Sequence, residues 1–145
     1  MANHLALENQ LCFRLYRLNK RMAKMYAPLL KSLNLTYPQY LVMLVLWQST
    51  SEGRSVKSLG ETLELDSGTL SPLLKRMQAN GLVQRTRSEE DERTVLISLT
   101  ESGIALEAQA IDIPLTLFGK TGLSESEFTQ LTYLLDKLIS TTANT

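Results

Sequence analysis

The sequence predicts a mainly α fold with a small β-hairpin wing: a winged helix-turn-helix between long N-terminal and C-terminal helices. Three observations carry this prediction. Apolar residues keep helical spacing at both ends of the chain. Two short helical patterns meet at a turn near residue 65, as in a helix-turn-helix. Two strand-like runs then follow around a charged loop, and a hairpin placed directly after a helix-turn-helix forms a wing.

Residues 5–33 predict the first helix. One apolar stripe follows a 4-3-4-3-4 spacing along it: Leu11, Leu15, Leu18, Met22, Met25 and Leu29. Pro28 interrupts the pattern and predicts a bend, because proline removes a helical hydrogen bond. Such a long stripe favours pairing with a second copy of the helix. Packing against a later helix of the same chain would explain it as well.

A buried core helix is predicted from Thr36, its cap, to Trp47, with Pro38 just inside. The polar segment 49–54 contains glycine and predicts a loop. A short helix over 55–65 completes this part of the chain.

The second helix of the motif begins after Asp66, which we expect to cap it, and stops at Gly81. Its expected inward face comprises Leu70, Leu73, Leu74 and Met77. Pro72 falls in the body of this helix, and the proline rule alone would start the helix at Ser71 instead.

Residues 82–87 and 94–100 predict the strands of the hairpin, with the charged loop between them. Two helices are expected to follow, one over 101–118, broken near Pro114, and one over 124–140. The second begins with the capping-box pattern of Ser124 and Glu127.

The formal net charge of the 145 residues is zero, which by itself argues against nucleic acid as a partner. The distribution of charge argues otherwise. Residues 101–145 carry six acids and two bases, a local charge of −4, so residues 1–100 carry +4. The bases form two groups, Arg14, Arg17, Lys20, Arg21, Lys24 and Lys31 in the first helix and Lys75, Arg76, Arg85, Arg87 and Arg93 in the middle. Solvated helix surfaces explain the first group well.

The single cysteine, Cys12, and the single histidine, His4, exclude several kinds of site. They leave no intramolecular disulfide, no zinc-type Cys/His set and no Ser/His/Asp or Cys/His arrangement for catalysis. We expect no metal and no cofactor. The sequence shows neither an apolar run near the roughly 18 residues that a membrane span needs nor a signal-peptide pattern. We expect a soluble, cytoplasmic protein.

Candidate DNA contacts lie on the outward face of the second helix of the motif. Small and hydroxyl-bearing residues surround its N-terminus, where they and the backbone N–H groups can face phosphates or base edges: Ser67, Gly68, Thr69 and Ser71. Lys75 and Arg76 follow on later turns, and a guanidinium on a helix in the major groove favours contact. Helix capping would explain Ser67 equally well.

At the wing tip, Arg93 follows four consecutive acids. A carboxylate such as that of Asp91 could hold the arginine extended, so that its guanidinium enters a narrow minor groove, where the potential is most negative. The alternative is a solvated loop with an internal ion pair of little energetic value.

Cys12 lies among apolar residues, and a free cysteine commonly packs as a small hydrophobe. Tyr16 shares its helix face, and Tyr26 lies two heptads beyond it. Along one straight helix Cys12 and Tyr26 would be roughly 21 Å apart, so they could meet only if a second copy of the helix crossed in the opposite sense. We expect Cys12 to lie beyond the first helical turn, where the helix dipole adds little.

These motifs, in this order, resemble the multiple-antibiotic-resistance regulator (MarR) family of dimeric repressors. More narrowly, the chain resembles the one-cysteine organic hydroperoxide resistance regulators over residues 7 to about 100. The matching stretches are LENQLCFRLY, LNLTYPQYLVMLVLW, LDSGTLSPLLKRM and RSEEDERTVLISLT. The resemblance implies a single structural domain with an N-terminal dimerisation helix (1–35), a DNA-binding region (36–100) and C-terminal dimerisation helices (101–145).

The resemblance also implies a function. The chain would be a homodimeric repressor bound to a pseudo-palindromic double-stranded operator, and organic hydroperoxides would release it by oxidising the cysteine. The reactive cysteine falls on Cys12 and its phenols on Tyr16, Tyr26 and Tyr37, with Tyr26 reaching from the partner subunit. The recognition helix falls on residues 67–78, tolerating Pro72, and the wing arginine on Arg93. The chain lacks the second, resolving cysteine of some relatives, which removes a disulfide between subunits as the product. The oxidised thiol could instead be capped by a small thiol, cyclise with a backbone nitrogen or be over-oxidised.

Three alternatives stay open. A regulator of the same fold could respond to a small phenolic ligand, with Cys12 incidental. A global redox or virulence regulator could share the pattern with a broader specificity. An enzyme using Cys12 as a peroxidase is disfavoured, because it would need a recycling cysteine or a dedicated reductant.

Overall fold

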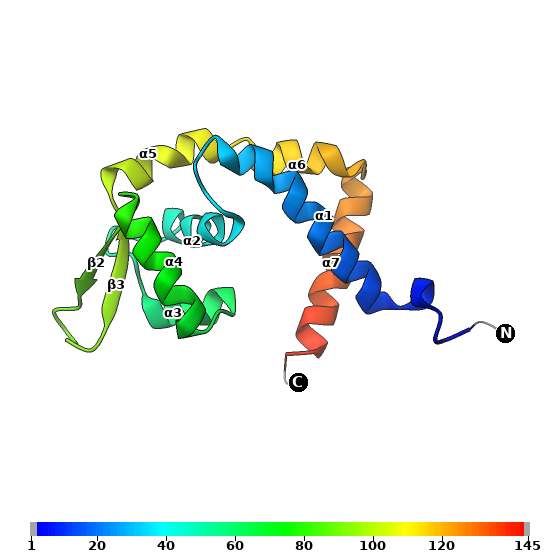
Figure 1. The fold of residues 1–145 in the computed structure, drawn as a ribbon, viewed down its shortest axis with the longest axis horizontal. Helices are drawn as coiled ribbons and strands as arrows, with labels where there is room; N and C mark the ends of the chain where they lie inside the picture. Colours follow the sequence, from blue (N-terminus) through cyan, green and yellow to red (C-terminus); the bar gives the residue numbers. More distant parts are fainter. Residues whose placement is uncertain (1–2, 144–145) are drawn as a thin grey trace. The chain divides into compact units, whose positions relative to one another are not determined.

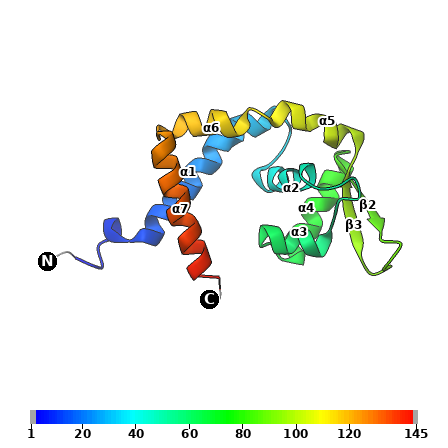
Figure 2. The same cartoon turned by 180° about the vertical axis from the view of Figure 1, so that it is seen from behind.

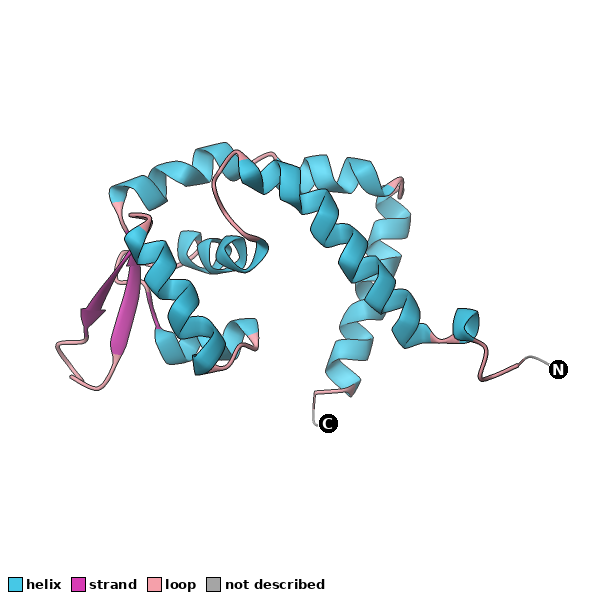
Figure 3. Cartoon of the chain, in the orientation of Figure 1, coloured by secondary structure: helices cyan, strands magenta, loops and turns pink. Residues whose placement is uncertain are grey.

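The computed structural model describes residues 3–143, which divide into two compact units with the boundary between Ile111 and Asp112. The first unit contains, in chain order, η1 (Leu7–Asn9), α1 (Leu11–Lys31), α2 (Tyr37–Trp47), β1 (Arg54–Ser55), α3 (Val56–Leu63), α4 (Ser67–Ala79), β2 (Val83–Arg87), β3 (Val95–Leu99) and α5 (Glu101–Ala110). The second contains α6 (Ile113–Thr121) and α7 (Glu125–Thr141). Helices dominate and the strands form one small sheet, which confirms the predicted fold class (Figures 1 and 3).

Helix α1 begins at Leu11 rather than near residue 5, because Gln10 is extended (φ −87°, ψ 123°) and a separate 3₁₀ turn precedes it. Pro28 lies inside α1, which continues to Lys31. The later start corrects one expectation: Cys12 is the second residue of α1 and lies in its first turn. Backbone N–H groups are free there, and the helix dipole favours negative charge.

Helix α2 is the centre of the first unit. The hydroxyl of Thr36 accepts the backbone N–H of Gln39, whose side-chain oxygen accepts the N–H of Thr36 in return. This capping box and Pro38 start the helix where the sequence predicts. The side chains that α2 buries are Gln39, Tyr40, Val42, Met43 and Leu46. Burial of this apolar surface is the main force that holds α2 in place.

Helices α3 and α4 form the helix-turn-helix, seen from both sides in Figures 1 and 2. The Asp66 carboxylate accepts the backbone N–H of Thr69 at 2.7 Å and caps α4. The hydrogen bonds from Thr69 hold the pKa of Asp66 below its usual value. Pro72 stands inside α4, so the proline rule fails here. The predicted inward face is confirmed: Leu70, Leu73, Leu74 and Met77 are all buried.

The sheet has three antiparallel strands in the order β1-β3-β2. Strands β2 and β3 form the predicted wing. Arg54 belongs to strand β1 rather than to the predicted loop, since Arg54 and Ser55 pair with β3. Two residues are too few to show a strand period in the sequence. Gly53 precedes this strand with φ +82°, and a Cβ there would collide with the backbone of Ile97.

The predicted break near Pro114 is confirmed and coincides with the boundary of the two units, because α5 ends at Ala110 and α6 starts at Ile113. The Ser124–Glu127 capping box is also confirmed. The rings of Phe118 and Phe128 meet edge to face at 5.2 Å. Within residues 3–143, no helix is long and apolar enough to cross a membrane.

Candidate DNA interface and redox site

The N-terminal turn of α4 presents its side chains to solvent. Ser67, Gly68 and Thr69 are exposed and Ser71 is half-buried. The backbone N–H of Thr69 is used by the Asp66 cap, so the cap fixes the direction in which this turn faces. This arrangement suits contact with phosphate oxygens, because a helix N-terminus favours anions.

Lys75 and Arg76 are also exposed on α4, while the residues before and after them, Leu74 and Met77, are buried. The helix therefore buries one face in the first unit and presents cations on the other. The candidate DNA contacts between residues 67 and 76 therefore lie on the solvent-facing side of a single helix, as a recognition helix requires.

The wing loop is ordered by hydrogen bonds to Asp91. Its carboxylate accepts the backbone N–H of Arg93 at 3.0 Å and the hydroxyl of Thr94 at 3.4 Å, and its carbonyl accepts the Thr94 N–H at 2.9 Å. The sequence suggested that Asp91 holds the Arg93 guanidinium. In the structure the carboxylate binds the backbone of Arg93 instead, and the Arg93 side chain is exposed. Asp91 therefore shapes the turn that carries the arginine.

Cys12 is exposed in the first turn of α1, and Tyr16, one turn later, is 60% exposed. The Lys20 Nζ lies 5.1 Å from the centroid of the Tyr16 ring, a cation–π contact. Neighbouring apolar side chains on the same helix are also largely exposed: Leu11, Leu15 and Leu18. An exposed apolar stripe of this length is typical of an interaction surface.

Tyr26 and Tyr37 do not lie near Cys12 of the same chain. They meet each other, with ring centroids 4.9 Å apart, at the place where the end of α1 packs on the start of α2. A third phenol, Tyr40, which the sequence analysis missed, lies 5.8 Å from Tyr26 and 6.5 Å from Tyr37. The sequence could have indicated this contact, because Tyr40 lies three residues after Tyr37 on the same predicted helix and such side chains are neighbours.

Burial raises the pKa of Tyr26 to about 12, and the phenols of Tyr37 and Tyr40 add to the shift. Burial likewise raises the pKa of Tyr40. These two phenols therefore stay protonated at neutral pH and can donate a hydrogen bond to an anion.

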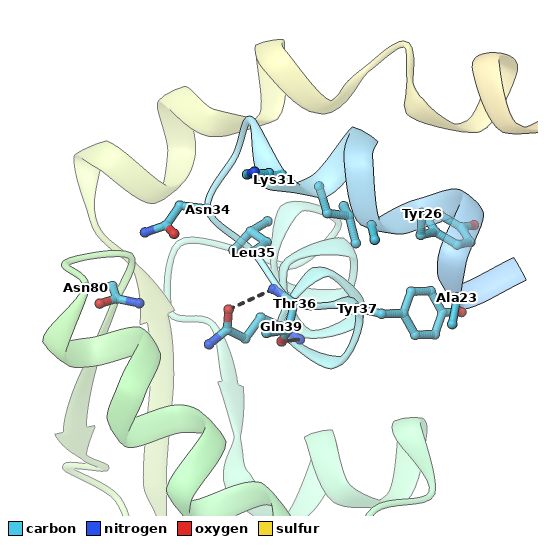
Figure 4. A pocket seen from close by; sticks show the side chains of 11 residues that line it. Ala23, Tyr26, Lys31, Asn34, Leu35, Thr36, Tyr37, Gln39 and Asn80 are labelled. Carbon is cyan, nitrogen blue, oxygen red and sulfur yellow. Dashed lines mark hydrogen bonds between the residues drawn. The ribbon is translucent and has the colours of Figure 1, made fainter. Parts of the chain in front are cut away.

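A pocket of about 530 Å³ opens beside this tyrosine cluster (Figure 4). Tyr26 and Tyr37 lie on one side of it, and the remainder is lined by apolar side chains, such as Leu30 and Leu35, together with polar ones, among them Lys31, Gln39 and Asn80. Cys12 does not line the pocket. Within a single chain, Cys12 is therefore separate from the Tyr26 and Tyr37 phenols of the proposed redox site, and only Tyr16 lies near it.

One face of α1 is strongly basic. Six exposed cations lie on it and no acid occurs in the helix: Arg14, Arg17, Lys20, Arg21, Lys24 and Lys31. Within the part of the chain that the structure describes, none of them forms an ion pair. Residues 3–143 also contain no cluster of His, Cys, Asp or Glu that could hold a metal ion.

A helix-turn-helix whose second helix has an exposed, capped N-terminus, followed by a two-stranded wing, defines the winged-helix class of DNA-binding proteins. Residues 24–109 match the family described as transcriptional regulator SarA/Rot. The chain is 54% identical to the organic hydroperoxide resistance transcriptional regulator of Bacillus subtilis (strain 168), over 96% of this chain and 93% of the relative. The chain therefore belongs to the SarA/Rot family of transcriptional regulators and resembles the organic hydroperoxide type.

Two solved structures support the fold. Reduced AbfR bound to DNA, a Staphylococcus epidermidis protein, superposes with a TM-score of 0.78 at 34% identity, covering 93% of this chain and 91% of AbfR. A MarR-family transcriptional regulator from Rhodococcus sp. RHA1 gives a TM-score of 0.79 at 25% identity, covering 94% of each chain. The predicted MarR-type fold is confirmed, and the protein is a transcriptional regulator rather than an enzyme.

Proposed function

We propose that the chain is a homodimeric repressor that releases its operator when an organic hydroperoxide oxidises Cys12. The observation that carries this proposal is the position of the single cysteine: it is exposed, in the first turn of α1, beside the apolar side chains of Leu11 and Leu15, which are 53% and 38% exposed. The similarity to the Bacillus subtilis regulator of organic hydroperoxide resistance supports the choice of oxidant.

A dimer would complete the site. If α1 of the partner subunit crossed α1 in the opposite sense, Cys12 of one chain would approach the Tyr26 and Tyr37 phenols of the other. Both Tyr26 and the pocket beside it are open to such an approach in the single chain. Phenols that stay protonated would donate hydrogen bonds to the thiolate and so favour the reactive form.

The proposed chemistry is a two-electron oxidation. The Cys12 thiolate attacks the terminal oxygen of the hydroperoxide, an S–O bond forms as the O–O bond breaks, and the departing alkoxide takes up a proton to become an alcohol. The resulting sulfenic acid condenses with a small thiol, giving a mixed disulfide and water. Apolar neighbours such as Leu11 and Leu15 would favour organic hydroperoxides over hydrogen peroxide.

Oxidation would act on DNA binding through the dimer. Each product adds bulk or polarity to a packed interface, and a shift of the two winged units would change the spacing of the two α4 helices. Because a dimer binds half-sites at a fixed separation, a small change in spacing weakens both contacts at once. The recognition contacts would come from Ser67, Gly68, Thr69, Ser71, Lys75 and Arg76, with Asp91 shaping the wing that presents Arg93.

The test is DNA release, measured by fluorescence anisotropy on a palindromic site from upstream of the protein's own gene. Reduced wild type and Cys12→Ser are titrated with cumene hydroperoxide and with hydrogen peroxide. We expect both proteins to bind DNA, and only the wild type to be released, at lower concentrations of the organic peroxide. Release of Cys12→Ser by peroxide would contradict the proposal.

A second candidate is favoured by the 530 Å³ pocket beside the tyrosine cluster, which is large enough for a small aromatic ligand. In that case a phenolic compound, rather than an oxidant, would release the DNA. The same assay decides between the two, because wild type that ignores both peroxides and responds to a phenolic ligand would replace the first proposal with the second.

A further inference from the structure

A second pocket, of about 320 Å³, lies in the first unit, away from the tyrosine cluster. It is bordered by the end of α2, the turn that follows, β3 and α5. Its walls combine apolar side chains and hydroxyls with one indole and one carboxylate: Leu99, Ile104, Ser49, Thr50, Trp47 and Glu107. No residue of the DNA interface or of the proposed redox site lines it.

The indole of Trp47 has a fixed position in this pocket. Its Nε1–H donates to the carbonyl of Gly103 at 2.9 Å and ties α2 to α5. Gly103 permits the close approach of α5, because a Cβ there would collide with the carbonyl of Leu82. The ring is half-buried, so part of its surface remains available to the pocket.

Glu107 lies one helical turn beyond Gly103 on the same face of α5. Helical side chains lean toward the N-terminus of their helix, so the Glu107 side chain leans back toward the turn that holds Trp47. Glu107 is exposed and has no hydrogen-bonding or ion-pairing partner within residues 3–143. It is also the one charged residue among the side chains that line the pocket.

We propose that this pocket binds a small organic monocation of the quaternary ammonium class. An aromatic ring attracts a weakly hydrated cation through its negative face, and tryptophan is the strongest of the aromatic residues in this respect. The Glu107 carboxylate complements the charge, and Leu99 and Ile104 contact the alkyl groups. The pocket volume is near the lower end of the range for small-molecule sites, so we expect a small cation.

Trp47 is the only tryptophan in the chain, so its fluorescence reports on this pocket alone. The reduced, full-length protein is titrated with tetraethylammonium chloride, with sodium chloride at matched ionic strength as the reference. We expect a saturable change with tetraethylammonium that sodium chloride does not produce. Benzoate and tert-butanol serve as anionic and neutral probes, and we expect neither to saturate.

Two variants test whether the Glu107 carboxylate binds the cation. Glu107→Gln keeps the shape and removes the carboxylate, and we expect it to weaken tetraethylammonium binding by about tenfold. Glu101→Gln removes an acid from the same helix that does not line the pocket, and we expect it to bind like wild type. Equal weakening in both variants, unchanged affinity in Glu107→Gln, or no saturable signal in wild type would overturn the proposal.

Discussion

The rings of Tyr26 and Tyr37 lie 4.9 Å apart, centroid to centroid, at a tilt of 45°. One ring comes from the last third of α1 and the other from the first residue of α2, so this contact joins the helix that carries the cysteine to the core helix of the winged unit. Tilted aromatic pairs at this separation stabilise a packing arrangement beyond the apolar area that they bury.

The raised pKa of Tyr26 predicts a loss of stability in alkaline solution. The phenol ionises near pH 10 in the unfolded chain and near pH 12 in the folded one. Between these values the unfolded chain binds fewer protons than the folded one, so the free energy of unfolding falls as the pH rises from 10 to 12 and is unaffected by this group below pH 10. Urea unfolding at pH 8, 10 and 11 measures the fall.

Tyr26→Phe is the matched variant for that measurement. It keeps the ring and removes the ionisable hydroxyl, so we expect a shallower decline in stability between pH 10 and pH 11 than in wild type. Tyr133→Phe, at an exposed position of α7, provides the control and should decline as wild type does. If the free energy of unfolding of Tyr26→Phe falls with pH as steeply as that of the wild type, the pKa of the Tyr26 phenol is not raised in the folded protein.

Tyr40 is expected to act as a positioning residue for the proposed redox site. It is 2% exposed and contacts the Tyr26 ring, so its own ring holds that phenol in place. We expect Tyr40→Phe to be oxidised by cumene hydroperoxide within about twofold of the wild-type rate, and Tyr40→Leu to be slowed about tenfold.

A purely structural role would lower the thermal stability of Tyr40→Leu without changing the pH dependence of its oxidation. The pH–rate profile, measured by trapping the sulfenic acid, is therefore the decisive reading, because a misplaced Tyr26 phenol would no longer favour the thiolate. A slower reaction with an unchanged profile would assign Tyr40 to packing alone.

The exposed stripe of α1 predicts a dimer interface. Leu15 and Leu18 are 38% and 44% exposed in the single chain, and the double variant Leu15→Glu, Leu18→Glu would bury two carboxylates if that stripe were covered. We expect sedimentation analysis to give a dimer for wild type and a monomer for the double variant. Lys24→Glu, on the basic face, should stay dimeric, and a dimeric double variant would move the interface elsewhere.

The wing predicts two separable effects on DNA affinity. Arg93→Ala removes an exposed cation and should reduce the dependence of log affinity on log salt by about one. Asp91→Ala removes the acceptor of the Arg93 N–H and should weaken binding about threefold to tenfold by loosening the loop. Glu90→Ala is the control for Asp91: removal of a negative charge by itself should strengthen DNA binding, so we expect no loss in Glu90→Ala, and equal losses in these two variants would contradict the loop effect.

Much of the fold was predictable because local signals and long-range packing agree. Helix α2 has a capping box, an early proline and a continuous apolar run, and all three give the same start. The inward face of α4 could be predicted from the spacing of its apolar residues alone. Its first residue could not, because Asp66 and Pro72 give conflicting signals, and the burial of Leu70 favours the earlier start.

The candidate site was less predictable. The start of α1 depends on one extended residue, Gln10, which no composition rule marks, and the position of Cys12 in the first turn depends on it. Tyr40 looked like one more apolar residue of a core helix, and its proximity to Tyr26 arises only when α1 packs on α2. The hydrogen bond from the Arg93 backbone N–H to the Asp91 carboxylate likewise depends on the conformation of the loop, which the sequence does not specify.

The segregation of charge has a practical consequence for handling the protein. The six exposed cations of α1 lie on one helix that contains no acid, although the chain as a whole is neutral. Retention on a chromatographic resin depends on the local field of the face that touches it, not on the net charge. The protein should therefore be retained by heparin or by a cation exchanger at neutral pH, and nucleic acid should copurify with it until the salt concentration is raised.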